Sequence, residues 1–378
     1  MRLREKIVQE IRERGPIAFS RYMELCLYDP ELGYYSRNAE QFGKAGDFYT
    51  SSDIHAVFGR LLGRQFEEMW QVLGSGEIQI LELGPGRGLF AQDVLDWSEK
   101  KFPDFFAALH YSLAERSPVL QKKLQDRLCS RFSAGKVSLT SSVGPASGSS
   151  GTAIIFANEF FDAFPVEVLS AQGELRVAEK DGHLVETWAP GSSEALDFLD
   201  RYSLHPEEGE RIEAPLLAQR YMADAASTLQ HGFLIAIDYG YTRDELLAGR
   251  HRGTVMAYRQ HSVSANPYEA PGEQDITAHV NFTALAAAAE QQGMQVQPQL
   301  TQSQFLLGIG EKNQFADAFE ECRLPQERAK VALQLKHLIT PAGVGETFHV
   351  LVASKGVDSD KVAGLSGLSF GKGRSHPQ

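Results

Sequence analysis

The sequence has few cysteines and no pattern of metal ligands. Cys26, Cys129 and Cys322 are its three cysteines among 378 residues, and they lie far apart. An odd number at such spacing fits neither a disulfide framework nor a CxxC metal pair, and no two histidines flank an acid at helical spacing. We therefore expect thiols that behave as small buried hydrophobic side chains in a reducing compartment, and no metal site.

A long apolar run and a targeting segment are also lacking. No stretch approaches the roughly 20 apolar residues that span a bilayer. The first residues, Met1 to Ile7, are charged and contain no apolar core of a signal peptide, and Glu5 and Glu10 are atypical of a transit peptide. These absences predict a soluble chain without membrane insertion, located in the cytoplasm.

There is no excess of basic residues either. The chain has 37 Lys and Arg against 49 Asp and Glu, so its formal net charge is −12. An acidic surface is poorly suited to neutralising phosphates, which argues against nucleic acid as the main partner. It fits a neutral or basic substrate better, including a protein segment that carries arginine. The hydrophobic fraction of 43% is ample for a full core and excludes global disorder.

What is present is an alternation of strands and helices after a helical start. Residues 1–75 have amphipathic helical spacing, including a helix from about His55 to Leu73, and are interrupted by a loop of small and aromatic residues. From residue 76 to 354, apolar runs typical of buried strands alternate with helical segments. The expected strands are 78–83, 111–115, 152–157, 233–237 and 347–353, and the expected helices are 89–101 and 118–128. This order predicts an α/β fold with a Rossmann-like, doubly wound sheet.

Two insertions and a tail extend the predicted core. Residues 166–190 alternate between polar and apolar, with a turn signal at Asp181-Gly182, and predict a β-hairpin. A second insertion is expected over 240–345. Residues 355–378 are rich in glycine and serine and predict a disordered tail. The chain is thus expected to consist of a helical extension, a core with insertions, and this tail.

The most informative motif follows the first expected strand. Gly84, Gly86 and Gly88 open the next helix, so the backbone can turn sharply and its N–H groups can approach a ligand. The G-x-G-x-G spacing after Glu82 resembles the first motif of class I methyltransferases, because the ammonium group of S-adenosyl-L-methionine needs a carboxylate nearby. A dinucleotide-binding loop would have glycine or alanine where Leu89 stands, and such an oxidoreductase is the alternative.

A second acid stands at the end of the second expected strand. Open α/β sheets bind ligands outside the carboxyl ends of their strands. At that position Glu115 can accept hydrogen bonds from both ribose hydroxyls of the cofactor. A solvated acid near the start of a helix is the alternative.

The segment from Asn158 to Pro165 carries the candidate catalytic residues, because it follows the next strand and should face the methyl group. Glu159 and Asp162 could hold a guanidinium group through paired hydrogen bonds and take its proton, with Asn158 beside them. Phe160 or Phe161 could wall the pocket and favour a cation. The alternative is an ordinary loop with two solvated acids and two phenylalanines of the core.

The chain resembles the MidA family of methyltransferases in a series of segments that spans nearly its whole length. These segments are Arg21-Tyr22-Met23, Tyr28-Asp29-Pro30, Gly33-Tyr34-Tyr35, Gly46 to Ser51, Glu82 to Gly88, Asn158 to Pro165, Asp238-Tyr239-Gly240 and Gly272 to Phe282. Their order and number are more specific than the glycine motif alone. The chain departs from the family at Ser52-Asp53, where Pro-Glu is common, at Asn281, where Asp is common, and at Leu89, where Thr is frequent.

The resemblance implies a class I methyltransferase core with an N-terminal helical extension and inserted β and α elements. It also implies S-adenosyl-L-methionine as the cofactor and methylation of arginine in a protein partner. In the mitochondrial member of the family the product is symmetric dimethylarginine, and the target is a subunit of the respiratory NADH dehydrogenase. The oligomeric state is not fixed by the sequence, and a homodimer is one expectation.

The resemblance adds candidates outside the two loops. The residues expected to bind the cofactor from a covering loop are Asp47, Thr50 and Ser51. Helix capping explains a residue such as Ser51 equally well. Asp238 and Tyr239 could line the acceptor pocket, and His279 could serve as a base, although a lone histidine is more often structural.

Three other functions compete with protein arginine methylation. A small-molecule N- or O-methyltransferase would use the same cofactor loop, and Asn158-Glu159-Phe160-Phe161 has a faint likeness to an Asn-Pro-Pro-Tyr motif that serves several acceptors. A respiratory-complex assembly factor could keep the fold and act mainly by docking. A nicotinamide-dependent oxidoreductase is the third.

Overall fold

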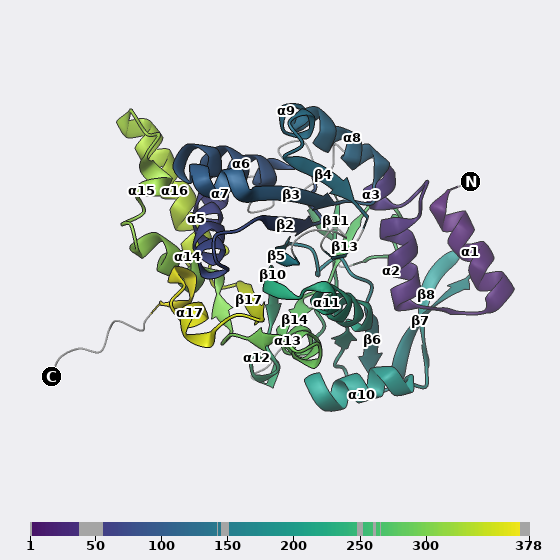
Figure 1. The fold of residues 1–378 in the computed structure, drawn as a ribbon. Helices are drawn as coiled ribbons and strands as arrows, with labels where there is room; N and C mark the ends of the chain where they lie inside the picture. The colour runs from purple at the N-terminus through teal and green to yellow at the C-terminus, as the bar shows by residue number, and fades with distance from the viewer. Residues whose placement is uncertain are drawn as a thin grey trace.

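A central sheet of nine strands forms the middle of the molecule in this computed structural model (Figure 1). The structure describes residues 2–37, 56–141, 143–144, 151–247, 252–259, 262–264 and 266–370. The strand order is β15-β17-β10-β5-β2-β3-β4, with β14 paired to β10 and β16 paired to β17. The strands are β2 (Ile78–Leu83), β3 (Leu109–Ala114), β4 (Val137–Thr140), β5 (Thr152–Asn158), β10 (His231–Tyr241), β14 (Val280–Asn281), β15 (Gln295–Val296), β16 (Leu300–Thr301) and β17 (Phe348–Lys355).

Five of these strands run parallel, from β4 to β10, and β17 runs antiparallel to β10. The chain first forms β2, moves outward to β3 and β4, and returns to add β5 on the other side of β2. The connections therefore diverge at the carboxyl ends of β2 and β5, which is where doubly wound sheets bind ligands. The predicted Rossmann-like α/β class is confirmed.

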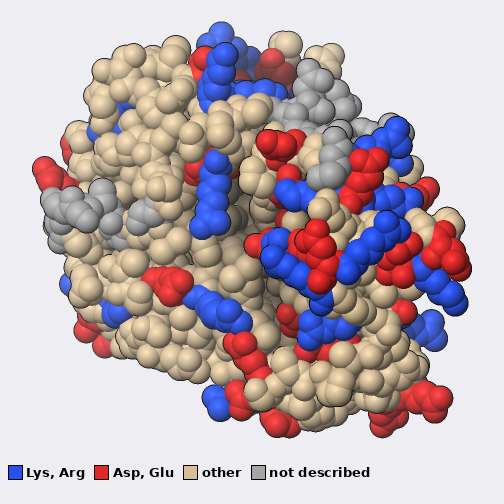
Figure 2. All heavy atoms as spheres, turned by 90° about the vertical axis from the view of Figure 1, so that its right-hand side faces the viewer, with Lys and Arg blue, Asp and Glu red and all other residues tan. Residues whose placement is uncertain are grey.

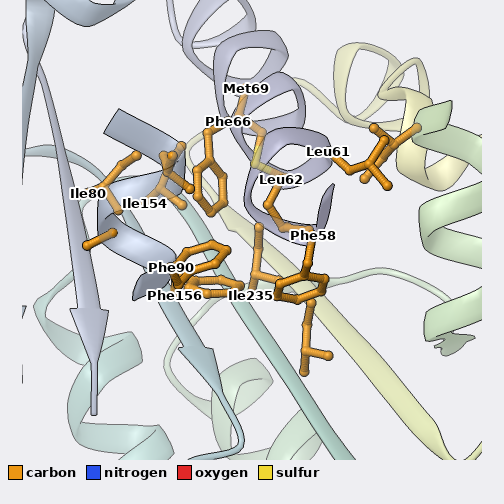
Figure 3. Packing of buried hydrophobic residues seen from close by; sticks show 14 of the residues in the cluster. Phe58, Leu61, Leu62, Phe66, Met69, Ile80, Phe90, Ile154, Phe156 and Ile235 are labelled. Carbon is orange, nitrogen blue, oxygen red and sulfur yellow. The ribbon is translucent and has the colours of Figure 1, made fainter. Parts of the chain in front are cut away.

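Helices cover both faces of the sheet, which explains why β2, β5 and β10 are apolar along almost their whole length. On one face lie α5 (Ala56–Val72), α6 (Leu89–Lys101), α7 (Pro103–Ala108), α14 (Gln302–Glu311), α15 (Ala316–Phe319) and α16 (Pro325–Ile339). On the other lie α11 (Leu216–Thr228) and α13 (Phe282–Gln291). Figure 3 shows the first face, where the Phe90 ring of α6 stacks on Phe156 of β5 at 4.5 Å between centroids and Phe66 of α5 meets Phe156 edge-on at 5.4 Å.

Beside β3 the chain forms α8 (Pro118–Arg127) and α9 (Cys129–Ser133). The Ser117 hydroxyl accepts a hydrogen bond from the N–H of Leu120 at 3.5 Å, and Pro118 occupies the first turn. A capping serine and a proline in the first turn are typical of a helix start, and the helix predicted over 118–128 is confirmed.

A second sheet of five strands lies beside the core, at the right of Figure 1. It contains β1 (Ile17–Ala18), β6 (Glu167–Ser170), β7 (Gly173–Lys180), β8 (His183–Ala189) and β9 (Ile212–Ala214). The predicted hairpin is β7–β8, and its turn has left-handed backbone at Asp181 (φ 52°) and Gly182 (φ 80°). The insertion is longer than predicted, because α10 (Ser193–Tyr202) and β9 belong to it as well.

The N-terminal helices pack on this second sheet. They are α1 (Leu3–Arg14), α2 (Phe19–Tyr28) and α3 (Tyr34–Arg37), and β1 joins the sheet by pairing with β7. After α12 (Arg243–Leu247) the chain forms a three-stranded sheet of β11 (Met256–Arg259), β12 (Ser262–Ser264) and β13 (Asp275–Thr277). Ala257 of β11 and Ile276 of β13 belong to the apolar cluster that the N-terminal helices form with the second sheet. Figure 2 shows this side of the molecule, where basic and acidic side chains lie interspersed and the surface is hollowed near the centre.

The end of the described chain is ordered. After β17 come α17 (Ser359–Ala363) and a short 3-10 helix, Ser366–Leu368, with Leu365 and Leu368 buried. The carboxylate of Glu68 in α5 accepts a hydrogen bond from the N–H of Ser366 at 2.9 Å. The predicted disorder is therefore wrong for residues 355–370, because two leucines among the small residues anchor the segment to α5.

The cysteines are free thiols in different environments. Cys26 is buried, Cys322 is half-buried and Cys129 is exposed, so the expectation that all three are buried is wrong for Cys129. Within the described ranges, no group of three or more His, Cys, Asp or Glu side chains is arranged to hold a metal ion. In those same ranges, no helix has the length and apolar character to cross a bilayer.

Candidate active site

The glycine loop between β2 and α6 is built from three left-handed residues. The φ angles are 65° at Gly84, 53° at Gly86 and 74° at Gly88, a region that residues with a side chain enter at a cost. A Cβ atom at Gly84 would lie 2.6 Å from the Phe160 ring, whereas one at Gly86 would meet no atom of the described residues within 4 Å. Gly84 is thus required for packing, and Gly86 leaves room for a ligand beside the start of α6.

Glu82 lies in β2 just before this loop. Its side chain is buried, and its carboxylate accepts a hydrogen bond from the Tyr111 hydroxyl of β3 at 2.8 Å. Burial raises the pKa of Glu82 to about 8, although the bond from Tyr111 lowers it. A buried carboxyl group without a described cation beside it would gain from a positively charged ligand.

Glu115 follows β3, at the neighbouring strand end. Its carboxylate accepts a hydrogen bond from the N–H of Ser117 at 2.7 Å, and its carbonyl accepts one from the Gln121 side chain at 2.7 Å. Burial raises the pKa of Glu115, while the bond from Ser117 lowers it. The bond from Ser117 holds the Glu115 carboxylate, and the bond from Gln121 holds its backbone. The carboxylate can accept further hydrogen bonds.

The turn after β5 presents the first candidate catalytic residues. Glu159 has left-handed backbone (φ 48°), and its N–H bonds to the Ile237 carbonyl of β10 at 2.9 Å. The Asn158 amide donates to the Glu159 carboxylate at 3.3 Å. The amide oxygen of Asn158 is buried and has no hydrogen-bond partner in the described part of the chain. A buried acceptor in this state is a candidate to receive a donor from a substrate.

The Asp238 side chain of β10 binds the backbone of the turn after β5. One carboxylate oxygen accepts from the N–H groups of Phe160, Phe161 and Asp162 at 3.0, 2.9 and 3.3 Å, and the other accepts from the N–H of Tyr239 at 3.0 Å. Burial, together with the charges of Asp162 and Glu159, raises the pKa of Asp238 well above its ordinary value. The sequence suggested a residue lining the pocket, whereas this side chain is 1% exposed and faces the backbone of the turn.

Asp162 is bound on two sides by residues far away in the sequence. Its carboxylate accepts a hydrogen bond from the Tyr239 hydroxyl, and its carbonyl accepts one from the N–H of Ala278 at 2.9 Å. Burial raises the pKa of Asp162 to about 6, and the bond from Tyr239 lowers it. The His279 ring meets the Tyr239 ring edge-on at 5.3 Å, so these three predicted residues lie together.

The two predicted phenylalanines differ in their environment. Phe160 is half-buried, covers Gly84 and meets the Tyr221 ring of α11 at 5.3 Å. Phe161 is 4% exposed and packs in the core beneath, stacked with Phe164 at 5.6 Å. Phe160 therefore connects the glycine loop with the turn, and Phe161 has the place of a core residue.

Most of the predicted residues meet at the carboxyl ends of β2, β5 and β10. The exceptions are Asp47, Thr50 and Ser51, which lie outside the described residues. The sequence did not single out Tyr111, whose only signal is its position in a strand beside Glu82. It also gave no role to Tyr28, although Tyr28-Asp29-Pro30 is one of the segments that resemble the family.

Comparison with known proteins shows that this chain is similar in sequence to a methyltransferase family and its members. The sequence pattern of a family described as S-adenosyl-L-methionine-dependent methyltransferases matches residues 61–299. The Drosophila melanogaster protein arginine methyltransferase NDUFAF7 homolog, mitochondrial, is 30% identical over 390 residues, which cover 94% of this chain and 85% of that protein. The human protein arginine methyltransferase NDUFAF7, mitochondrial, is 27% identical over 378 residues, which cover 91% of this chain and 81% of that protein.

Among solved structures, one from Burkholderia thailandensis that is bound to S-adenosyl-homocysteine is 27% identical to this chain. It superposes with a TM-score of 0.82, covering 97% of this chain and 94% of that one. The likeness thus includes the N-terminal helices and the inserted sheets as well as the central sheet.

Proposed function

The chain belongs to the family of S-adenosyl-L-methionine-dependent methyltransferases, and from this premise we propose that its methyl acceptor is an arginine side chain of a protein. Two relatives that cover most of the chain are named protein arginine methyltransferases. The acidic character of the turn after β5 supports the same acceptor, because Glu159 and Asp162 suit a cation. The net charge of −12 agrees with a basic substrate.

The residues around the glycine loop fit the cofactor. The buried carboxyl group of Glu82 can pair with its ammonium, the space beside Gly86 admits its amino acid portion, and Glu115 can bind the ribose hydroxyls. When bound, S-adenosyl-L-methionine supplies a methyl group on a positively charged sulfur. The chain's task is then to align an acceptor nitrogen with that methyl group and to remove the proton that this nitrogen loses.

A guanidinium group needs help to act as a nucleophile, because its nitrogen lone pairs are delocalised. Carboxylates at Glu159 and Asp162 can bind two of its N–H groups and orient the third nitrogen, and the Asn158 amide oxygen can accept a further hydrogen bond. The new bond joins nitrogen and the methyl carbon, and the electron pair of the broken bond stays on sulfur. The proton released from nitrogen passes to a carboxylate, for which Asp162, with a pKa of about 6, is suited.

The observation that carries this proposal is the pair of buried polar groups in the turn. A carboxyl group with a pKa of about 6 can be ionised at neutral pH and still accept a proton. The Asn158 amide oxygen has no hydrogen-bond partner among the described residues, so it is free to accept one from a substrate. A guanidinium group provides donors to both.

The test is methylation by the purified chain with a labelled methyl donor. Peptides that carry arginine are compared with the same peptides carrying lysine in its place, and with a panel of small amines. We expect label in the arginine peptides alone and its loss in Glu159→Gln, with cofactor affinity unchanged by calorimetry. Label in small amines alone would instead establish the small-molecule enzyme. Cofactor binding without label in any acceptor would favour a docking function.

The finer features of the function belong to the same proposal. We expect symmetric dimethylarginine and a subunit of a respiratory NADH dehydrogenase as the target. Mass spectrometry of partner proteins from cells that lack the chain would identify the arginine that loses its methyl groups. A homodimer and a cytoplasmic location stay predictions, and because the relatives are named mitochondrial proteins, the location needs its own measurement by cell fractionation.

A further inference from the structure

Two tyrosines of the N-terminal extension reach the turn after β5. The hydroxyl of Tyr28, the last residue of α2, donates to the Ala163 carbonyl at 2.9 Å. The ring of Tyr35 in α3 stacks on the Tyr28 ring, with centroids 5.6 Å apart and planes at 29°. The Tyr35 hydroxyl in turn donates to the carboxylate of Asp275 in β13 at 2.9 Å. Residues of α2, α3 and β13, of which Tyr35 and Asp275 are 240 positions apart, thus form one wall beside the candidate catalytic turn.

This wall is open on one side. Tyr28 keeps 42% of its surface exposed, although its hydroxyl reaches into the protein to bond with Ala163. Burial raises the pKa of the Tyr28 hydroxyl, and the negative charges of Asp275, Asp162 and Glu115 raise it further, whereas the positive charge of Arg116 opposes them. The Tyr28 ring is thus accessible to a ligand, while its hydroxyl lies in the field of three acids.

We propose that the stacked Tyr28–Tyr35 pair and the Asp275 carboxylate form the binding surface for the guanidinium group of the acceptor. This inference rests on the proposed function. A guanidinium group is planar and weakly hydrated, so it stacks on a tyrosine ring more favourably than a lysine ammonium does. The hydrogen bond from Tyr35 fixes the orientation of the Asp275 carboxylate beside the ring pair, and an oriented carboxylate pairs well with a guanidinium group.

The arrangement also assigns the N-terminal extension a role in binding the acceptor. Asp162 belongs to the catalytic turn, Glu115 to the expected ribose site, and both lie close enough to Tyr28 for their charges to act on its hydroxyl. An arginine held on the Tyr28 ring would therefore lie beside the turn, because the Tyr28 hydroxyl is bonded to Ala163. The core sheet alone would lack this wall, because Tyr28 and Tyr35 precede it in the chain.

The test compares Tyr28→Ala with Tyr28→Phe, using an arginine peptide in steady-state kinetics and calorimetry for the cofactor. Tyr28→Ala removes the ring, and we expect KM for the peptide to rise roughly tenfold, with the cofactor dissociation constant unchanged. Tyr28→Phe keeps the ring and should raise KM much less. Tyr22→Phe is the matched control, because the Tyr22 hydroxyl also donates to a backbone carbonyl, that of Pro267, at 2.7 Å, within the apolar cluster of the extension.

Asp275→Asn gives a second route if Tyr28→Ala does not fold. Asparagine keeps an acceptor for the Tyr35 hydroxyl and removes the charge, so KM for the peptide should rise while cofactor binding stays unchanged. Arginine methylation by the wild type, combined with a KM in Tyr28→Ala and Asp275→Asn that is no higher than in Tyr22→Phe, would overturn this surface and leave the proposed function intact. Failure of the wild type to methylate any arginine peptide would instead remove the proposed function itself.

Discussion

Two loops at the same edge of the sheet are built in opposite ways. The loop after β2 depends on three glycines within five residues, each with left-handed backbone, and its contacts with α6 are local. The turn after β5 has left-handed backbone at a glutamate, Glu159, and contacts from distant parts of the chain hold it. Those contacts come from Asp238, Tyr239, Ala278 and Tyr28.

The difference suggests that the loop after β2 and the turn after β5 have different roles. A loop that binds a constant cofactor can be specified by a short motif, because every member of the family needs the same turn. The turn after β5, which is proposed to bind the acceptor, is fixed by contacts from three other regions of the chain, so substitutions far away can alter it. Mutations in the first loop should therefore affect cofactor affinity, and mutations under the second should affect acceptor methylation and folding together.

The largest effect is expected from Asp238→Ala. The change leaves the N–H groups of Phe160, Phe161 and Asp162 buried without an acceptor, and each such group costs about 1–3 kcal/mol. We expect the free energy of unfolding to fall by about 3 kcal/mol and methyl transfer to fall by about 100-fold or more. Urea unfolding and the labelled-donor assay measure the two.

Two further variants keep this prediction testable. Asp238→Asn retains an oxygen acceptor and should fold even if the alanine variant does not. Asp317→Ala removes a buried acid that pairs with Arg64 away from the turn, so it should lower stability without lowering methyl transfer by the same factor. Equal losses of activity in Asp317→Ala and Asp238→Ala would mean that the turn has no special dependence on Asp238.

The same contrast explains what the sequence could predict. The bounds of β2 and α6 agree with the prediction residue for residue, because an apolar run and a glycine cluster mark them locally. The place of Asp238 beneath the turn could not be foreseen, since it depends on the pairing of β10 with β5 in one register. The wall of Tyr28, Tyr35 and Asp275 joins residues 240 apart and was equally hidden. The ordered tail depends on contacts with α5 that composition does not reveal.

The next effect comes from a matched pair in the glycine loop. In Gly84→Ala, the left-handed backbone costs about 1–2 kcal/mol and the new methyl group meets the Phe160 ring at 2.6 Å, so stability and activity should both fall. In Gly86→Ala the backbone cost is similar, but the methyl group meets no atom of the described part of the chain within 4 Å. We therefore expect Gly86→Ala to fold nearly normally and to lose about tenfold in cofactor affinity. Thermal unfolding and calorimetry separate the two, and identical behaviour of both variants would contradict the distinction.

A smaller effect concerns the protonation of Glu82. Its ordinary pKa is 4.5 and burial raises it to about 8 in the folded chain. Between these values the unfolded chain releases the proton and the folded chain keeps it, so the cofactor-free protein should lose stability as pH rises toward 8. Pairing with the cofactor's ammonium favours the ionised form, and binding at pH 7 should therefore release close to one proton.

Calorimetry in two buffers of different ionisation enthalpy measures that proton, and thermal unfolding over pH 5–8 measures the stability. In Glu82→Gln we expect no proton release at pH 7, a flatter dependence of stability on pH, and cofactor affinity lower by about tenfold. Proton release that persists in Glu82→Gln would assign it to another group.

The smallest effect tests the acceptor turn through one hydrogen bond. The Tyr239 hydroxyl donates to the Asp162 carboxylate and so favours its ionised form, while burial holds the pKa of Asp162 at about 6. If ionised Asp162 takes the proton from the acceptor, methyl transfer should fall as pH drops through that pKa. Tyr239→Phe removes a bond that stabilises the carboxylate, so the acidic limb of the pH–rate profile should move upward by about one pH unit.

This shift distinguishes a base from a structural acid. If Asp162 only braces the turn, Tyr239→Phe would lower the rate equally at every pH and leave the limb in place. Tyr268→Phe, which removes a tyrosine–carboxylate bond to Glu186 of β8 at 3.1 Å, away from the turn, should change neither rate nor limb. An acidic limb that stays fixed in Tyr239→Phe and is absent from the residual rate of Glu159→Gln would transfer the role of base to Glu159. The turn after β5 would then act through Glu159, its glutamate with left-handed backbone. In the glycine loop after β2, the left-handed positions carry no side chain that could act as a base.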